Sequence, residues 1–140
     1  MKVLIDTYGW IALLDPREAK HQEVKNCYQE LKNKKTVIIT TDYILDETIT
    51  LLYRRLPAEV AQDALTSLEK AVKKELLQLE WIASEHFNEA LSLRKKLIDK
   101  PNISFTDLTS MTVIKEMNIN YILTDDHHFL QVGLSVQNLP

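Results

Sequence analysis

The stretch Lys2–Leu14, with the sequence KVLIDTYGWIALL, contains the change of pattern that decides the fold. Its first four residues, Lys2–Ile5, are typical of a buried β-strand. Asp6 follows at once, and the next eight residues, Thr7–Leu14, have the character of a short helix. The chain therefore begins with a strand that opens directly into a helix.

The same alternation continues to the end of the chain. Further strands are expected at Thr36–Thr40, Leu76–Ile82, Tyr121–Thr124 and Leu134–Leu139. Helices are expected at Arg17–Lys32, Asp42–Arg55, Ala58–Lys74, Ser84–Asp99 and Thr106–Met117. Strands that alternate with helices pair in parallel, so the sequence predicts a layered α/β fold around a parallel sheet. In such sheets ligands bind outside the carboxyl ends of the strands, and acids placed there are the ones to examine.

The composition fits one globular domain spanning residues 1–140. A chain of 140 residues that is 45% hydrophobic can bury its own core. The net charge of −3 gives no general attraction to nucleic acid, although a local basic face or bound cations can reverse the sign. The only glycines are Gly9 and Gly133, which excludes both a GxGxxG dinucleotide turn and a P-loop.

The compartment that the sequence predicts is the cytoplasm. Cys27 is the single cysteine, which excludes an intrachain disulfide and a cysteine zinc cluster and fits a reducing environment. No apolar run approaches the length of a membrane span, and the apolar region at the N-terminus is too short for a signal peptide.

Carboxylates follow two of the expected strands. Asp6 follows the first strand, and Asp125 and Asp126 follow the strand at Tyr121–Thr124. Asp6 also suits the N-cap of the next helix, so a capping role and a functional role both remain open. One acid of the second pair can cap a short helix at His127–Gln131 while the other points into a cleft. Spacing alone does not decide which one.

Glu47 lies inside an expected helix, three residues after Ile44 and four before Leu51, on the face that should meet the sheet. Its neighbour Asp46 belongs to a polar stripe suited to solvent. Burying a carboxylate on an apolar face costs on the order of several kcal/mol of folding free energy unless the group pairs with a cation or is hydrogen-bonded. The alternative is that Glu47 sits at the margin of the stripe or pairs with an arginine.

Asp107 opens the last long helix. Ser104 stands three residues before it, so Ser104 can be the N-cap and Asp107 the acid that favours the positive end of the helix. Ser110, one turn further on, would share a face with Asp107 and could orient it by a hydrogen bond.

Taken together, these acids indicate a metal site more specifically than any one of them does alone. Several carboxylates that converge without arginines cannot all stay ionised unless divalent cations bind among them. Oxygen-only ligation suits Mg²⁺ or Mn²⁺. Such ions activate water and stabilise the charge on a phosphodiester during in-line displacement.

Four motifs carry a resemblance to a known family. They are VLIDTYGWIALLD, TTDYILDETITLL, SFTDLTSM and ILTDDHHFLQVG, and the match in which they stand runs over essentially the whole chain. In this set and order, the chain resembles the PIN-domain nucleases, in particular the VapC-type toxin ribonucleases. The resemblance implies a three-layer α/β/α sandwich with a central parallel sheet.

The resemblance also implies the site. It places the acidic cluster and its Mg²⁺ or Mn²⁺ on Asp6, Glu47, Asp107 and a fourth acid. The family's last motif, laid on Thr124 and Phe129, implies Asp126 as that acid, with Asp125 as a cap or neighbour. Asp42 stands where the family usually has asparagine, a departure that adds a charge beside the cluster or preserves a cap.

The function expected is hydrolysis of RNA phosphodiester bonds by metal-activated water, by the toxin of a toxin–antitoxin pair. RNA, an antitoxin protein and a second copy of the chain are the expected partners, and no membrane is involved. The alternatives are a housekeeping RNA-processing nuclease and a non-catalytic RNA-binding or scaffold module.

The adjacent histidines His127 and His128 are tempting metal ligands. On a helix, neighbouring residues point about 100° apart, so the pair cannot easily serve one ion. We expect one to face solvent and the other to pack or form a hydrogen bond. His21 is expected on a helix surface, and His86 carries no functional signal.

Overall fold

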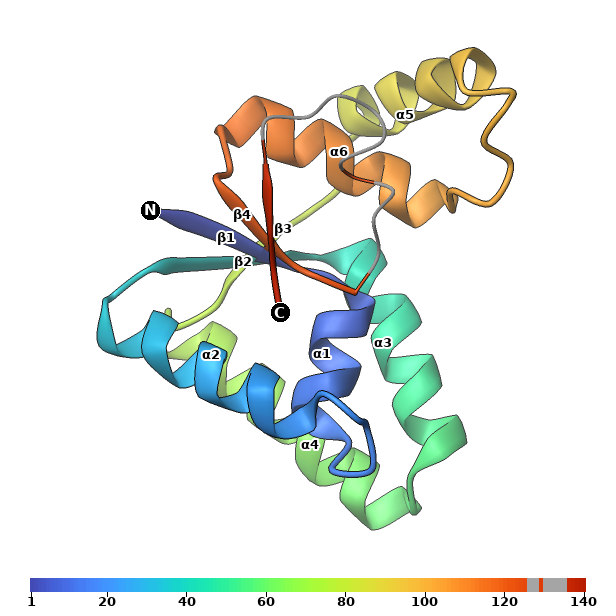
Figure 1. The fold of residues 1–140 in the computed structure, drawn as a ribbon. Coiled ribbons are helices and arrows are strands. Elements are labelled where there is room, and N and C mark those ends of the chain that lie inside the picture. Colours follow the sequence, from blue (N-terminus) through green and yellow to red (C-terminus); the bar gives the residue numbers. More distant parts are fainter. Residues whose placement is uncertain (126–128, 130–135) are drawn as a thin grey trace.

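The computed structural model describes residues 1–125, 129 and 136–140, and the alternation of strands and helices expected from the sequence is present (Figure 1). The strands are β1 (Lys2–Ile5), β2 (Val37–Thr41), β3 (Gln78–Glu80), β4 (Tyr121–Leu123) and β5 (Gln137–Leu139). The helices are α1 (Thr7–Leu14), α2 (His21–Asn33), α3 (Asp42–Arg55), α4 (Ala58–Lys73), α5 (Ser84–Lys96) and α6 (Phe105–Met117).

The strands form one sheet in the order β3-β2-β1-β4-β5, and every neighbouring pair is parallel. The chain builds outward from β1 to β3 and then crosses back to place β4 on the other side of β1. The direction of this progress therefore reverses between β1 and β4. In open parallel sheets, the carboxyl side of such a switch point is where ligands bind.

Helices cover both faces of the sheet. Figure 1 shows α1, α2, α3 and α4 on one face and α5 and α6 on the other. The three-layer α/β/α arrangement predicted from the sequence is confirmed.

The central strand is buried throughout its apolar part. Val3, Leu4 and Ile5 are completely inaccessible to solvent, as expected for a parallel strand covered on both faces. Trp10 on α1 is buried as well, and its indole N–H donates to the hydroxyl of Thr40 on β2 at 3.0 Å. This hydrogen bond holds α1 against β2, the neighbour of the central strand.

Gly9 allows α1 to approach the sheet closely. A Cβ atom at this position would lie 2.5 Å from the carbonyl oxygen of Leu123 and 2.8 Å from Cγ2 of Ile5. Only a residue without a side chain fits there. The start of α1 is therefore pressed against the ends of β1 and β4.

Several expected boundaries are corrected by the structure. The second helix begins at His21 and not at Arg17, because residues 15–20 form a separate connection with its own ion pairs. The strand expected at Leu76–Ile82 is limited to Gln78–Glu80. The short helix expected at His127–Gln131 lies mainly outside the described residues, and this includes His127 and His128. The start of the expected last strand also lies outside them.

Within the described residues, no helix is both long and apolar enough to cross a membrane.

Candidate active site

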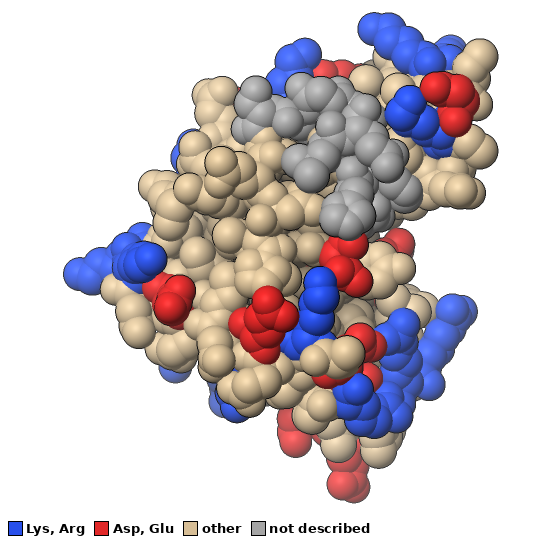
Figure 2. Space-filling view, in the orientation of Figure 1, with Lys and Arg blue, Asp and Glu red and all other residues tan. Residues whose placement is uncertain are grey.

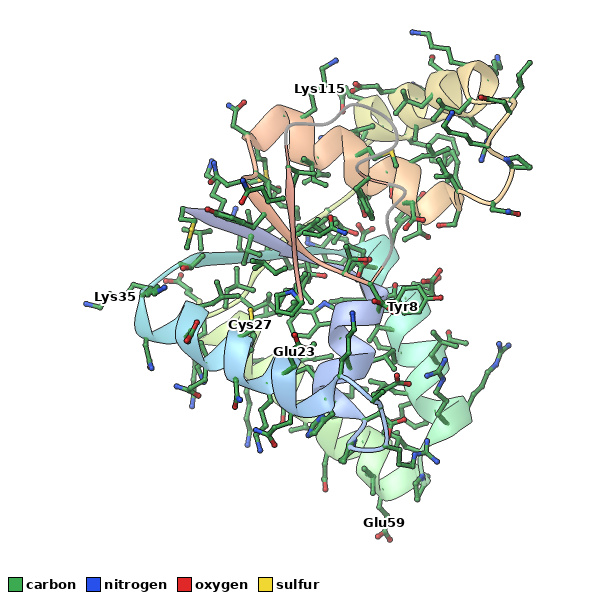
Figure 3. The ribbon with its side chains drawn as sticks, in the orientation of Figure 1. Tyr8, Glu23, Cys27, Lys35, Glu59 and Lys115 are labelled. Carbon is green, nitrogen blue, oxygen red and sulfur yellow. The ribbon has the colours of Figure 1, made fainter. Side chains whose placement is uncertain are left out.

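The carboxyl edge of the sheet gathers residues from distant parts of the sequence. Ile5 at the end of β1 pairs with Leu123 at the end of β4, so Asp6 and Thr124 are the next residues on adjacent strands. The backbone N–H of Asp6 donates to the carbonyl oxygen of Leu123 at 3.4 Å. Figure 3 labels Tyr8 at the start of α1, which marks this edge in the view.

Asp6 is buried at this edge with only 4% of its surface exposed. Its Oδ1 accepts a hydrogen bond from the backbone N–H of Gly9 at 2.9 Å, which makes it the N-cap of α1. Its Oδ2 accepts a hydrogen bond from the hydroxyl of Thr124. The capping role expected from the sequence is confirmed, and the second contact fixes the orientation of the carboxylate. A carboxylate has about four acceptor positions, so both roles are compatible with binding a cation.

The partnership between Thr124 and Asp6 was not predicted from the sequence. Thr124 is itself buried, with 4% of its surface exposed. The two residues are 118 positions apart in the chain. The available signal was a hydroxyl directly after the strand that borders β1, at the same edge as Asp6.

Asp107 is half-buried in the first turn of α6, and the helix runs away from the same edge. Its backbone N–H donates to the hydroxyl of Ser104 at 3.0 Å, so Ser104 is the N-cap as predicted. Ser110 is buried, but its hydroxyl has no hydrogen-bond partner within residues 1–125, 129 and 136–140. The expected hydrogen bond from Ser110 to Asp107 is therefore absent from this part of the chain.

The expected burial of Glu47 is wrong. Glu47 is exposed on α3, and the buried residues of that helix are Ile44, Thr48 and Leu52. Glu47 therefore lies beside the buried stripe and not on it. Its carboxylate can reach solvent and substrate without the desolvation cost expected from its place in the sequence. Asp46 is exposed, as predicted.

Asp42 links two strands at this edge. Its Oδ1 accepts a hydrogen bond from the backbone N–H of Ile82 at 2.8 Å, just beyond β3. The N-cap of α3 is Thr41, whose hydroxyl accepts from the backbone N–H of Ile44 at 3.1 Å. The expectation that Asp42 preserves a cap is thus corrected, because the preceding residue caps the helix.

Asp125 is exposed and forms an ion pair with Lys20, whose Nζ lies 2.7 Å from its Oδ1. Asp126, the fourth acid selected by the family pattern, lies outside the described residues. The choice of Asp126 as the inward-facing acid stays a prediction. The role of cap or neighbour predicted for Asp125 also stays a prediction.

The donor atoms expected at the site are all carboxylate oxygens, the ligand type that Mg²⁺ and Mn²⁺ prefer. The residues 1–125, 129 and 136–140 contain no group of three histidine, cysteine or acidic side chains placed to hold a metal ion. Asp6, Glu47 and Asp107 thus do not form such a group by themselves. The donor chemistry fits a hard divalent cation, with Asp126 as the remaining donor to be tested.

Both described histidines make structural contacts. His21 begins α2, and its Nδ1 lies 2.8 Å from the carbonyl oxygen of Ala12 on α1. His86 accepts from the backbone N–H of Ala83 and contacts the carboxylate of Glu116, so it links α5 to α6. His86 thus has a structural role that its sequence position did not indicate.

These observations define an α/β protein with a buried acid, Asp6, at the switch point of its parallel sheet, the place where such sheets bind ligands. The chain belongs to the PIN domain family, which matches residues 3–134. The family resemblance drawn from the four sequence motifs is thereby confirmed.

Curated relatives resemble the chain over most of their length. One is the VapC ribonuclease of Archaeoglobus fulgidus, which is 29% identical over 132 residues, covering 93% of this chain and 81% of the relative. Another is the 23S rRNA-specific endonuclease VapC20 of Mycobacterium tuberculosis, which is 27% identical over 131 residues, covering 94% of each chain.

Two solved structures share the fold. The crystal structure of VapC20 from Mycobacterium tuberculosis, a toxin that cleaves the Sarcin-Ricin loop, matches with a TM-score of 0.77 and 26% identity, covering 96% of this chain and 98% of the other. The crystal structure of VapBC2 from Rickettsia felis, bound to a DNA fragment from its promoter, matches with a TM-score of 0.73 and 15% identity, covering 99% and 98%. At that identity, the second match supports the fold alone.

Proposed function

We propose that this PIN domain is a ribonuclease that hydrolyses RNA phosphodiester bonds with the help of Mg²⁺ or Mn²⁺, and that it is the toxin of a toxin–antitoxin pair. The observation that carries the proposal is the buried and doubly oriented carboxylate of Asp6 at the switch point. The names of the relatives, VapC ribonuclease and 23S rRNA-specific endonuclease, support the substrate class.

The residues that would hold the metal are Asp6, Asp107 and Asp126, with Glu47 completing the cluster. A bound Mg²⁺ or Mn²⁺ supplies activation of a water nucleophile and stabilisation of the charge that develops on the phosphate. The chain supplies a carboxylate that cannot swing away, since Asp6 is held by Gly9 from one side and by Thr124 from the other.

Glu47 has a different part in the proposal. Its exposed carboxylate is suited to position the attacking water or to accept its proton, which is general base catalysis. Asp107 is held by the first turn of α6, where the Ser104 cap fixes the backbone. Asp6 follows β1, Glu47 lies on α3 and Asp107 lies in the first turn of α6.

An antitoxin protein and a second copy of the chain are the proposed partners, and the cytoplasm is the proposed compartment. The relative VapC20, whose structure is 26% identical to this chain, is named as a toxin, which supports the first of these. A small antitoxin gene directly upstream would distinguish the toxin from a housekeeping RNA-processing nuclease. Light scattering on the purified chain tests the dimer, and a monomeric mass at micromolar concentration would contradict it.

The experiment that tests the enzyme compares wild type with Asp6→Asn on total RNA in Mn²⁺ buffer, with cleavage sites mapped by sequencing of RNA ends. Wild type is expected to cut at defined sites, and Asp6→Asn is expected to lose cleavage while keeping the fold by circular dichroism. Asp46→Asn is the matched control, because Asp46 is an exposed acid on α3 outside the proposed cluster. Cleavage that Asp6→Asn retains in a clean preparation would contradict the proposal.

A further inference from the structure

A cation from the α1–α2 connection lies beside the proposed site. Lys20 belongs to that connection, yet its Nζ lies 2.7 Å from Oδ1 of Asp125, which is 105 residues away at the end of β4. Asp125 directly follows Thr124, whose hydroxyl donates to Asp6. The Lys20 ammonium group therefore binds the residue next to Thr124, and Thr124 is the residue that orients the Asp6 carboxylate.

Other cations lie on the same side of the molecule. Figure 2 shows Lys and Arg side chains gathered over the α1–α2 connection and the C-terminal part of α3, below the carboxyl edge. Arg17 and Arg55 are part of this group, and a hydrogen bond of 2.8 Å joins the guanidinium of Arg17 to the carbonyl oxygen of Arg55. Lys20 belongs to the same connection as Arg17 and pairs with Asp125.

The ion pairs of this region differ in how easily they can be exchanged. The Arg17 guanidinium makes two hydrogen bonds of 3.0 Å to Asp15, whose side chain is 3% exposed, so breaking this pair would leave a buried charge. The Lys20 and Asp125 side chains are 47% and 61% exposed. Water can solvate both groups when they separate, so this pair contributes little and can open at low cost.

We propose that Lys20 is a substrate-binding residue that contacts an RNA phosphate next to the scissile bond, and that Asp125 is the counter-ion it leaves when RNA binds. The inference rests on the proposed ribonuclease function and names a further residue of that site. A lysine ammonium is a compact charge with three donors, well suited to a phosphate oxygen. The phosphate replaces Asp125 as the acceptor, and no covalent bond is made or broken.

Lys20 carries its positive charge at neutral pH, whether it pairs with Asp125 or with a phosphate. The hydrogen bond from Lys20 to Asp125 raises the pKa of the Lys20 ammonium group above its usual value, so Lys20 stays protonated at neutral pH. A phosphate would have the same effect, since it is also an anion. Asp125 competes with the phosphate for one cation, and removing it should favour RNA.

This competition predicts changes of opposite sign for the two partners. In steady-state cleavage of a fluorophore-labelled single-stranded RNA that wild type cuts, Lys20→Gln is expected to raise KM about 5- to 20-fold, with kcat little changed, because one charged phosphate contact is lost. Asp125→Asn is expected to lower KM or to raise the salt concentration needed to weaken binding. Lys20→Arg should restore most of the affinity.

Salt dependence gives a second measurement that a structural role would not change. With one phosphate contact fewer, the slope of log(1/KM) against log[KCl] should fall by about 0.7 for a single strand in Lys20→Gln. Lys115→Gln is the matched control, because Lys115 is an exposed lysine that also faces a carboxylate, Glu89, at 4.0 Å. Figure 3 shows Lys115 on α6, far from the edge marked by Tyr8.

The outcomes separate the inference from the function on which it rests. If wild type cleaves RNA but Lys20→Gln keeps the KM and salt slope of Lys115→Gln, the inference is wrong and the function stands. If both Lys20→Gln and Asp125→Asn raise KM and lower the melting temperature alike, the pair is structural and the inference is again wrong. If Asp125→Asn loses kcat, Asp125 is a metal ligand and not a counter-ion. If wild type cleaves no RNA, the proposed function itself fails.

Discussion

Asp6 combines two roles in one carboxylate. One oxygen caps α1, and the other receives the hydroxyl of Thr124 from the neighbouring strand. A side chain held at both oxygens has a single orientation, which is what a metal ligand or a charged active-site group requires. The capping role of Asp6 is therefore compatible with the functional role proposed for it, and the sequence need not be read as a choice between the two.

Thr124→Val should test the value of that second contact. The substitution keeps the shape of the side chain and removes the donor to Asp6, so we expect metal affinity or cleavage to fall about 10- to 100-fold. Thr124→Ser should retain most of the activity because the hydroxyl is kept. Thr36→Val is the control, since the buried Thr36 hydroxyl has no partner within the described residues and should tolerate the loss. Equal activity of Thr124→Val and wild type would remove Thr124 from the site.

Gly9→Ala should destabilise the whole domain. The new methyl group would meet the backbone oxygen of Leu123 at 2.5 Å, and backbone cannot move aside as a flexible side chain can. We expect a loss of about 1–3 kcal/mol or more in the free energy of unfolding, measured by urea denaturation. Ala12→Gly on the same helix serves as the comparison, with an expected cost of about 1 kcal/mol from helix propensity. An unchanged midpoint for Gly9→Ala would show that α1 can shift away from β4.

Helix α3 shows what hydrophobic periodicity can and cannot predict about a single helix. The sequence correctly predicted its bounds, Asp42–Arg55, and a buried stripe through Ile44. It then placed Glu47 on that stripe, whereas the structure buries Thr48 and exposes Glu47. Positions three and four beyond a buried residue are about equally close to its face, so periodicity cannot choose between them. The packing of α3 against the rest of the molecule makes the choice.

The connection between α1 and α2 carries a pH-dependent contribution to stability. The Arg17 guanidinium, hydrogen-bonded to the buried Asp15 carboxylate, lowers the pKa of Asp15 below its usual 3.8. A carboxyl group whose folded-state pKa is depressed stabilises the fold above its unfolded pKa and loses that effect as the pH falls through the folded pKa.

Asp15→Asn is the variant that tests this contribution. We expect it to cost about 1–3 kcal/mol at pH 7, where the charged hydrogen bonds of wild type are intact. The difference between wild type and Asp15→Asn should shrink as the pH falls below 3.8, followed by urea unfolding at a series of pH values. Asp99→Asn is the comparison, because Asp99 pairs with Lys100 at the exposed surface and should contribute little. A difference that grows towards low pH would contradict a depressed pKa for Asp15 in the folded state.

At the scale of the whole molecule, the strand order brings together residues that no local sequence pattern connects. The class of fold followed from alternating elements, but the contact between Thr124 and Asp6 spans 118 residues and that between Lys20 and Asp125 spans 105. Both arise because β4 returns to the side of β1 after the chain has built β2 and β3. The acids of the proposed site were chosen from the sequence and remain predictions, whereas the contacts of Asp6 and Asp125 depend on the strand order.

The charge of the molecule favours a bound metal at the proposed site. A chain with a net charge of −3 and several acids at one edge would repel an RNA phosphate there unless a cation neutralises them. Binding of Mn²⁺ to the folded state alone should therefore raise stability, by about 2.7 kcal/mol at 100 times the dissociation constant. The melting temperature of wild type should rise with Mn²⁺ concentration and return to its starting value in EDTA.

Asp6→Asn should lose most of this rise, since it replaces the central carboxylate with a neutral amide, whereas Asp46→Asn should keep it. This measurement needs no RNA and no turnover, so it examines the metal site independently of cleavage. Asparagine at position 6 remains a good N-cap, so α1 should keep its start and the metal-free melting temperature should change little. An equal rise in Asp6→Asn and wild type would place the ion elsewhere and remove the carboxyl edge as the metal site.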